Sequence, residues 1–487
     1  MIETPQVDWF ALSPTLALLG ASGVALLGAV LVPWWLRRGL AAFAAFGGFV
    51  TAGILGGFVF DRSEEEQELL VQSMTRDRLG ALAAIIVAGA GALAVLVSWG
   101  ERRRDHQGEY YALLAAAGAG MVFFVTASNL MTLFLGLEWF SIALYILCAL
   151  DTHRETSLEA GLKYLVVGSF GSAILLFGSA LVYGATGELG FSAISGAEVE
   201  DDYLRVAGLA LIITGLGFKA SAAPFHMWTP DVYQGAPTSV TAFMSAATKV
   251  AALVLAMRIL VVAFPDQEHL WTVAVAVIAV VSLGVGNLAA LVQRDVKRLL
   301  AYSSVSHAGF MLIAVSVNTE LGGRALLYYL IPYSAMSIGA FAVVAARERE
   351  LGAPVTIETL SGFGWERPFL GVAMWVFMLG FMGLPLTGGF VGKFYVFSAA
   401  FEAGWWWLVI AGVTATAISL YYYLNVIRAM YMRTDAELRP VIAGGSPPRD
   451  PLLVTAVAAS VVVTVGSFFL VQPLIEWASD ASASLPF

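Results

Sequence analysis

Fourteen predominantly apolar stretches follow one another along the chain, and each is long enough for a membrane-spanning helix, which needs roughly 20 residues. No long soluble domain lies between them, and charged residues make up only 13% of the sequence, against about 25% in an average soluble domain. A chain of 487 residues that is 59% hydrophobic cannot bury all of its apolar side chains in one water-facing core. The sequence therefore predicts an all-α polytopic protein in contact with membrane lipid.

The expected spans have boundaries good to a few residues, and the division at Ser128-Asn129 rests on length alone. The first seven are Leu12–Leu36, Leu40–Phe60, Leu79–Trp99, Tyr110–Ala127, Asn129–Leu150, Leu158–Tyr183 and Leu204–Gln234. The second seven are Ala236–Ala263, Leu270–Val292, Leu299–Val317, Ala325–Ala346, Phe369–Phe397, Trp405–Met432 and Leu452–Ile475.

Composition excludes several classes of function. A net charge of −9 argues against nucleic-acid binding, which needs a basic surface. The single cysteine, Cys148, cannot form a disulfide framework or hold an iron–sulfur cluster.

The first span lacks a preceding basic segment, so we do not expect a cleavable signal. The longest polar stretch, Asp61–Arg78, is rich in glutamate, and we expect a solvated loop there.

Basic residues indicate the orientation, because they gather on the cytoplasmic side of a membrane. Sixteen lie in or beside the odd-numbered loops, and six lie on the even-numbered side. We therefore expect the odd loops in the cytoplasm and both termini outside.

The remaining four cations, Lys163, Lys219, Lys249 and Lys393, lie inside predicted spans. The chain has five lysines, and the fifth, Lys297, falls in a predicted loop. A charge near the bilayer centre costs about 2.5–3.5 kcal/mol on insertion scales. Lysine can lose its proton when buried, whereas arginine stays charged. A row of buried groups that alternates between charged and neutral forms is therefore built from lysine. Lys163, near the start of its span, is as well explained by a side chain that reaches the interface.

Three further residues belong to this candidate proton path. Glu138 is the only charged residue between Asn129 and Leu150, and we expect it to pair with a buried lysine rather than to be a protonated carboxyl group. His307, in the tenth span, is either a relay or a buried structural histidine. His226 is either a relay or a polar residue at a helix break.

Two spans carry helix breakers beside a lysine. Proline and paired glycines interrupt the backbone hydrogen bonds of a helix, which a membrane tolerates only where protein or water replaces them. Corresponding breaks in two halves indicate inverted repeats with the transport site at the breaks. The spacing agrees, because Glu138 to Lys219 is 81 residues and His307 to Lys393 is 86. The breakers are Pro224, Pro230 and Pro237 in the seventh span and Pro385, Gly388 and Gly389 in the twelfth.

Three segments resemble a known family. FKASAAPFHMWTPDVYQGAPTSVTAFMSAATKVA, from Phe218 to Ala251, is similar to the signature of the antiporter-like subunits of respiratory complex I, and most of all to the N-type subunit of NADH:quinone oxidoreductase. QRDVKRLLAYSSVSHAGFM and LPLTGGFVGKFYVF match the same family. Lysine at position 393 and the lack of a long C-terminal lateral helix fit the N type better than its M-type and L-type sisters. GLPLTGG and GAPTS, both at the predicted helix breaks, depart from the commoner forms of the family.

The resemblance implies fourteen helices with two inverted five-helix repeats, helices 4–8 and 9–13. The expected divisions are residues 1–109, 110–263, 264–433 and 434–487. It also implies a Glu138–Lys163 pair, followed by Lys219, Lys249 and Lys393 along a polar axis. The implied function is proton translocation as a subunit of the enzyme in a bacterial plasma membrane. No cofactor is expected on this chain; flavin, iron–sulfur clusters and quinone belong to partner subunits, with the K-type and M-type subunits as neighbours.

Two other functions stay open. A multi-subunit cation/proton antiporter uses the same fold and is distinguished by its co-purifying chains. A purely structural scaffold does not explain why four of five lysines lie in spans.

Overall fold

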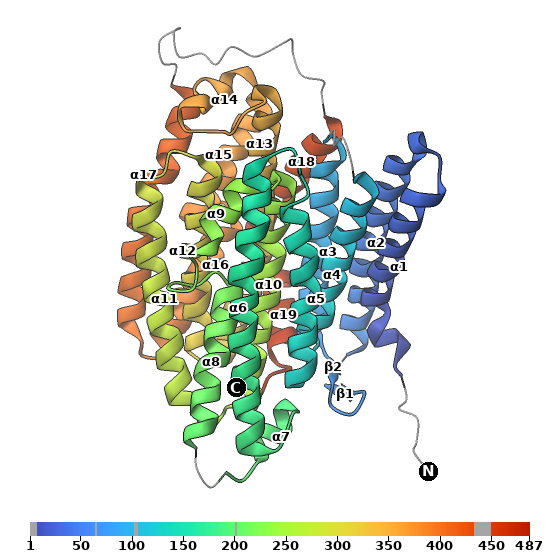
Figure 1. The fold of residues 1–487 in the computed structure, drawn as a ribbon. Coiled ribbons are helices and arrows are strands. Elements are labelled where there is room, and N and C mark those ends of the chain that lie inside the picture. Colours follow the sequence, from blue (N-terminus) through green and yellow to red (C-terminus); the bar gives the residue numbers. More distant parts are fainter. Residues whose placement is uncertain (1–6, 64–65, 102–105, 200–201, 433–449) are drawn as a thin grey trace.

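The computed structural model describes residues 7–63, 66–101, 106–199, 202–432 and 450–487. It is a bundle of long helices that run up and down (Figure 1). Within the described ranges, twelve helices are long and apolar enough to cross a membrane. The prediction of a helical membrane protein is confirmed. Six arginines counted for the orientation lie outside the described residues: Arg102, Arg103, Arg104, Arg433, Arg439 and Arg449.

The N-terminal helices form one side of the bundle and pack on one another. α1 ends before Pro33, which precedes the first residue of α2. Because proline lacks the backbone N–H that continues a helix, the first span ends five residues earlier than the predicted Leu36. The bounds are α1 (Trp9–Leu31), α2 (Trp34–Arg62), α3 (Arg78–Trp99) and α4 (Gln107–Val125).

The middle of the chain carries six helices, two of them short. They are α5 (Leu130–Cys148), α6 (Glu155–Thr186), α7 (Phe191–Gly196), α8 (Tyr203–Lys219), α9 (Trp228–Gly235) and α10 (Thr238–Ala263). The later part begins with α11 (Glu268–Leu291), α12 (Val296–Ser316), α13 (Glu320–Leu351), the 3-10 helix η1 (Glu358–Leu360) and α14 (Phe363–Glu366). It continues with α15 (Pro368–Met382), α16 (Gly388–Glu402), α17 (Trp406–Tyr431), α18 (Pro451–Phe469) and α19 (Val471–Ser482).

Two predicted spans are absent from the twelve long helices because the structure divides them. The expected span Leu204–Gln234 becomes α8 and α9, and Phe369–Phe397 becomes α15 and α16. α15 closes at Gly383, whose φ of 75° is the left-handed conformation that ends many helices. The count of fourteen crossings and the repeat remain predictions.

Short polar side chains begin many of the helices. Each accepts a hydrogen bond from a backbone N–H of the first turn, which has no partner within the helix. These capping residues are Asp8, Asp77, Asn129, Asp295, Thr319 and Asp450.

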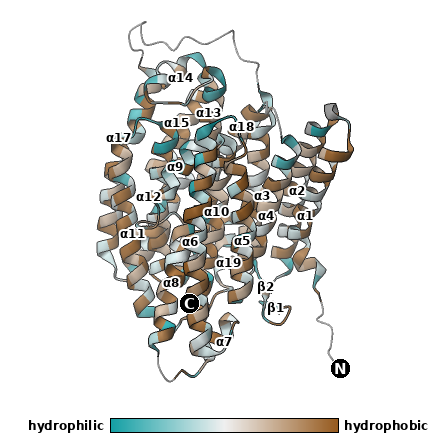
Figure 2. Cartoon of the chain, viewed as in Figure 1, coloured by the Kyte–Doolittle hydropathy of each residue, from teal (hydrophilic) through white to brown (hydrophobic). Residues whose placement is uncertain are grey.

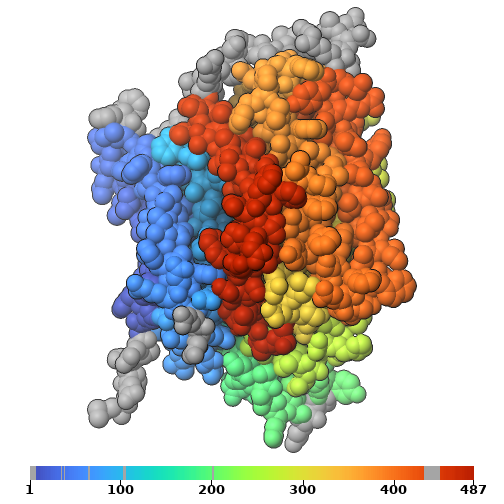
Figure 3. Space-filling view, turned by 180° about the vertical axis from the view of Figure 1, so that it is seen from behind, coloured from blue at the N-terminus to red at the C-terminus, as the bar shows by residue number. Residues whose placement is uncertain are grey.

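α10 and α13 form the centre of the bundle and pack against each other. Almost every residue of α10 is buried, as is most of α13. The outer helices carry apolar side chains on their exposed faces, as the hydropathy colouring shows (Figure 2). From behind, α18 and α19 lie between the N-terminal helices and the segment near residue 400 (Figure 3).

The expected solvated loop at Asp61–Arg78 is partly wrong. Its second half is a β-hairpin in which β1 (Gln67–Leu69) pairs antiparallel with β2 (Met74–Arg76). Met74, Thr75 and the following Asp77 are buried. The sequence did not indicate this burial. The buried residues come after the acidic run, and Thr75 and Asp77 bind Arg258, which is far along the chain.

Candidate functional site

Three of the lysines predicted inside spans are buried. Lys219 is 2% exposed, Lys249 0% and Lys393 3%. The lysine ion pairs of the described residues involve only Lys163 and Lys297. The three buried amines are therefore held by neutral groups.

Lys219, the last residue of α8, is surrounded by hydroxyl groups and aromatic rings. Its Nζ donates to the hydroxyl of Ser141 at 2.7 Å and to that of Tyr164 at 3.3 Å. It also lies 4.7 Å from the ring centre of Phe140, and such ring faces attract a cation.

Lys249 and Lys393 share a second arrangement, in which each amine binds a backbone carbonyl at a helix break. Lys249 Nζ donates to Ala220 O at 2.9 Å, just after the end of α8. Lys393 Nζ donates to Phe381 O at 2.9 Å, at the end of α15. The helix breaks free these carbonyls from intrahelical bonding.

The breakers named from the sequence lie at these two places. Pro224 lies between α8 and α9, and Pro385 lies between α15 and α16. Pro230 lies in α9, Pro237 precedes α10, and Gly388 begins α16. A Cβ at Gly389 would lie 2.0 Å from Gly380 O, so this close approach of the two half-helices requires glycine.

Glu138 lies on α5, partly buried, one helical turn before Ser141. Its Oε1 is buried and has no hydrogen-bond partner among the described residues. It lies within electrostatic range of Lys219. The structure thus brings Glu138 to the group around Lys219 through the shared face of α5.

The predicted Glu138–Lys163 pair is not formed. Lys163 Nζ instead binds Glu159 at 2.7 Å and Asp231 at 2.8 Å, and its side chain is 43% exposed. Asp231, on α9, also binds Arg298 at 2.5 Å. The pairing prediction failed because Asp231 is 68 residues from Lys163 in the sequence and reaches it only through the packing of α9 against α6.

Lys297 was predicted in a loop but lies in the first turn of α12, with its side chain 2% exposed. Its Nζ donates to Ala236 O at 2.8 Å and to Thr238 Oγ1 at 3.0 Å, and Glu348 lies 3.8 Å away. The predicted span began at Leu299, whereas α12 begins at Val296, so the prediction placed Lys297 outside the helix.

His307 is buried on α12 between two tyrosines. Its Nδ1 lies 2.8 Å from the hydroxyl of Tyr329, and its Nε2 lies 3.2 Å from that of Tyr423. Lys249 and Lys393 both lie within electrostatic range of it. The second candidate, His226, is partly exposed, and its ring centre lies 6.3 Å from that of Tyr302.

The hydroxyl-bearing residues of the site were not predicted from the sequence. Ser141, Tyr164, Tyr329 and Tyr423 contact the candidate residues directly. Serine and tyrosine are common in membrane helices, so single positions carry little signal.

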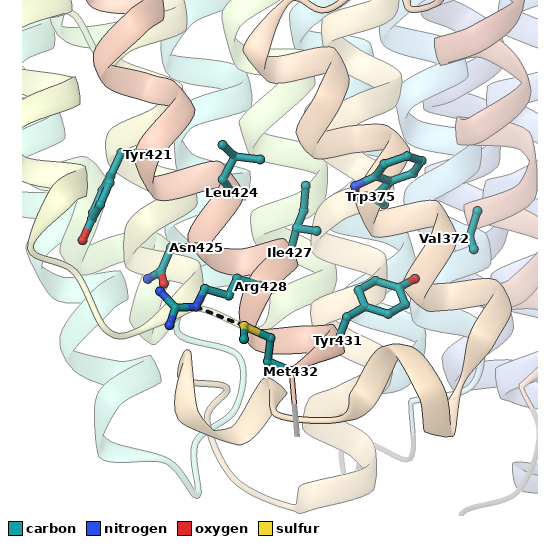
Figure 4. A pocket seen from close by; sticks show the side chains of 9 residues that line it. All are labelled: Val372, Trp375, Tyr421, Leu424, Asn425, Ile427, Arg428, Tyr431 and Met432. Carbon is teal, nitrogen blue, oxygen red and sulfur yellow. Dashed lines mark hydrogen bonds between the residues drawn. The ribbon is translucent and has the colours of Figure 1, made fainter. Parts of the chain in front are cut away.

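A separate groove lies on the outer side of α15 and α17 (Figure 4). In it, Arg428 Nε donates to the sulfur of Met432 at 3.1 Å. None of the candidate residues lines it, and within the described ranges no cluster of His, Cys, Asp and Glu could hold a metal ion. The groove is lined by Val372, Trp375, Tyr421, Leu424, Asn425, Ile427, Arg428, Tyr431 and Met432.

Comparisons with known proteins identify the family of the chain. A family model described as "NADH:quinone oxidoreductase/Mrp antiporter, TM" matches residues 127–419, which is more than half of the chain. The match includes every candidate span from α5 to α13 and the first part of α17. The chain belongs to this family. Among its relatives is NADH-quinone oxidoreductase subunit N of Salinibacter ruber, 42% identical over 396 residues, which are 79% of each chain. The resemblance to N-type subunits noted in the sequence is confirmed.

Two solved structures share the fold of the chain. A chain of respiratory complex I from Thermus thermophilus is 32% identical, with a TM-score of 0.79 over 95% of this chain and 98% of that one. A chain of the Mrp complex from a Dietzia species has a TM-score of 0.83 over 97% of both chains. Its identity is 22%, so this second likeness shows the fold alone.

Proposed function

We propose that the chain translocates protons along Glu138, Lys219, Lys249, His307 and Lys393, as the N-type membrane subunit of NADH:quinone oxidoreductase. The observation that carries this is the set of three fully buried lysines, each held by neutral acceptors. A permanently charged group would be expensive at such a place. A group that gains and loses a proton needs surroundings that accept both of its forms.

Backbone carbonyls provide such surroundings for Lys249 and Lys393. An ammonium and a neutral amine both have N–H groups to donate, so the bonds to Ala220 O and Phe381 O are compatible with both forms. Proton arrival then changes the charge of the site without breaking its hydrogen bond. A change of charge at one site acts on the next through an interior of low dielectric constant.

Glu138 and Lys163 take different parts in this proposal. Glu138 favours the charged form of Lys219, because opposite charges stabilise each other. Lys163 is bound to Asp231, so it is available to Glu138 only when the Asp231 contact opens. His226, beside the break at Pro224, is proposed as a relay between the break and solvent.

The two broken helices support an inverted repeat. We propose fourteen crossings, with residues 110–263 and 264–433 as the two five-helix units, flanked by residues 1–109 and 434–487. In each unit a lysine binds the carbonyl that a helix break frees.

Ion pairs at the two ends of the bundle support the orientation. Asp8 binds Arg76 and Arg78 binds Asp480, so both chain ends lie beside the second loop. The opposite end gathers Lys297, Glu348 and the odd loops. We propose that this end faces the cytoplasm of a bacterial cell. We propose K-type and M-type subunits as neighbours, with flavin, iron–sulfur clusters and quinone on partner subunits.

Purification of the complex from native membranes tests the assembly. Mass spectrometry is expected to find redox subunits with this chain, and the chain alone is expected not to oxidise NADH. Small antiporter subunits without redox partners would instead indicate a cation/proton antiporter.

Glu138→Gln is expected to lower proton pumping by about tenfold, the effect of roughly 1.4 kcal/mol on one transfer step. The reason is that glutamine keeps the shape but removes the charge that acts on Lys219. Pumping is measured in proteoliposomes and divided by the amount of assembled complex. Glu320→Gln, in an exposed pair with Arg324, is the control and is expected to have little effect. Unchanged pumping in Glu138→Gln would make this residue structural.

A further inference from the structure

Three hydroxyl groups follow one face of α13 at intervals of four residues: Tyr329, Tyr333 and Ser337. Residues at this spacing lie one above another on a helix, and all three are buried. We call them the α13 stripe. Because α13 packs against α10, α12 and α16, its polar face lies between the helices that carry Lys249, His307 and Lys393.

One end of the stripe reaches α10. The Ser337 hydroxyl donates to Ser245 Oγ at 2.6 Å. Ser245 lies four residues before Lys249 on the same helix, which is about one turn or 5.4 Å along its axis. The stripe thus begins beside the lysine of the first half.

The middle of the stripe reaches α12. The hydroxyl of Tyr333 lies 3.0 Å from Ser304 Oγ. Its ring centre is 5.2 Å from that of His307, which follows Ser304 by three residues. Ser304 and His307 therefore share the face of α12 that meets the stripe.

The other end reaches α16. The hydroxyl of Tyr329 lies 2.8 Å from His307 Nδ1. A Cβ at Gly392 would lie 2.4 Å from the Tyr329 ring, so this ring touches the backbone directly before Lys393. The stripe thus ends beside the lysine of the second half.

We propose that the α13 stripe, with Ser245 and His307, relays protons between Lys249 and Lys393. The relay rests on the proposed function. An N–H bond of the Lys249 ammonium breaks, and one forms at neutral Lys393. Each hydroxyl between them accepts a proton on its oxygen while it releases its own, so no group keeps a charge. His307 takes up a proton at Nε2 from the hydroxyl of Tyr423 and releases the proton of Nδ1 to the hydroxyl of Tyr329, so its tautomer is exchanged. The gaps of one helical turn are of the size that one bridging water closes.

Tyr329→Phe and Tyr333→Phe test the relay in the complete complex, because each removes one oxygen and keeps the ring. Proton pumping per assembled complex is expected to fall about tenfold in each, with a larger solvent deuterium effect than in the wild type. The matched control is Tyr328→Phe. The hydroxyl of Tyr328 is buried on the same helix but donates to the carbonyl of Ser467 at 2.6 Å, so it loses a comparable bond outside the relay.

Pumping in both stripe variants equal to that of Tyr328→Phe would overturn the relay. Lys249→Ala separates this failure from that of the proposed function. If Lys249→Ala stops pumping while both stripe variants pump normally, the lysine path stands and the stripe is structural. If Lys249→Ala itself pumps normally, the proposed function fails and the relay with it.

Discussion

Lys249→Arg is expected to stop proton pumping in complexes that still assemble, although arginine preserves the positive charge. Lys249 is fully buried and held by one backbone carbonyl. A guanidinium cannot release its proton in a protein, so it would hold the site permanently charged and stall the cycle. Lys249→Ala, which cannot take up a proton, is expected to fail as well. Acid uptake in proteoliposomes, normalised to assembled complex, measures both.

Two further variants separate protonation from packing. Lys249→Met keeps most of the side-chain volume and lacks the amine, so it is expected to fail like alanine. Thr248→Ser keeps a hydroxyl at the next position, where it bonds within α10 to Met244 O, and is expected to pump normally. Full pumping with arginine at 249 would show that the lysine is a fixed electrostatic element and that the protonation switch is wrong.

The membrane spans could be predicted because the length of an apolar run is set by the bilayer rather than by neighbouring helices. The breaks at α8–α9 and α15–α16 were predictable for a similar local reason, since proline and paired glycines act on their own helix. The burial of Lys219, Lys249 and Lys393 agrees with their place in those runs, whereas Lys163, which also lies in a predicted run, has a side chain that is 43% exposed.

Partners far apart in the sequence could not be predicted. Asp231 captures Lys163 only because α9 packs on α6. Lys297 is buried because Ala236 O and Thr238 receive it. The α13 stripe is defined by what faces Tyr329, Tyr333 and Ser337, and no spacing within one helix reveals that.

The buried pair between Asp77 and Arg258 shows the same limit, and it lies away from the proton path. Arg258, on α10, binds the carboxylate of Asp77 directly before α3 and also Thr75 of β2, at 2.8 Å. The Arg258 side chain is 2% exposed and that of Asp77 is 0% exposed. Burial and then the nearby Asp77 raise the pKa of Glu66, which lies 3.9 Å from Arg258. Asp77 is the main ion partner of Arg258, because both of its carboxylate oxygens accept hydrogen bonds from the guanidinium, whereas Glu66 is farther away.

Asp77→Ala is expected to prevent stable assembly, because it leaves the buried Arg258 guanidinium with only the half-exposed Glu66 carboxylate, 3.9 Å away, as a counter-charge. Loss of one partner of a buried pair costs about 3–5 kcal/mol, and the N-cap bond to Gly80 N is lost as well. The measurements are the amount of this chain in the assembled complex and its thermal midpoint. Glu66→Gln is the matched control: it changes a half-exposed carboxylate near the same arginine and is expected to leave both values close to wild type. Normal assembly and an unchanged midpoint in Asp77→Ala would mean that water or another group neutralises Arg258, and that the hairpin is not fastened to α10 by this pair.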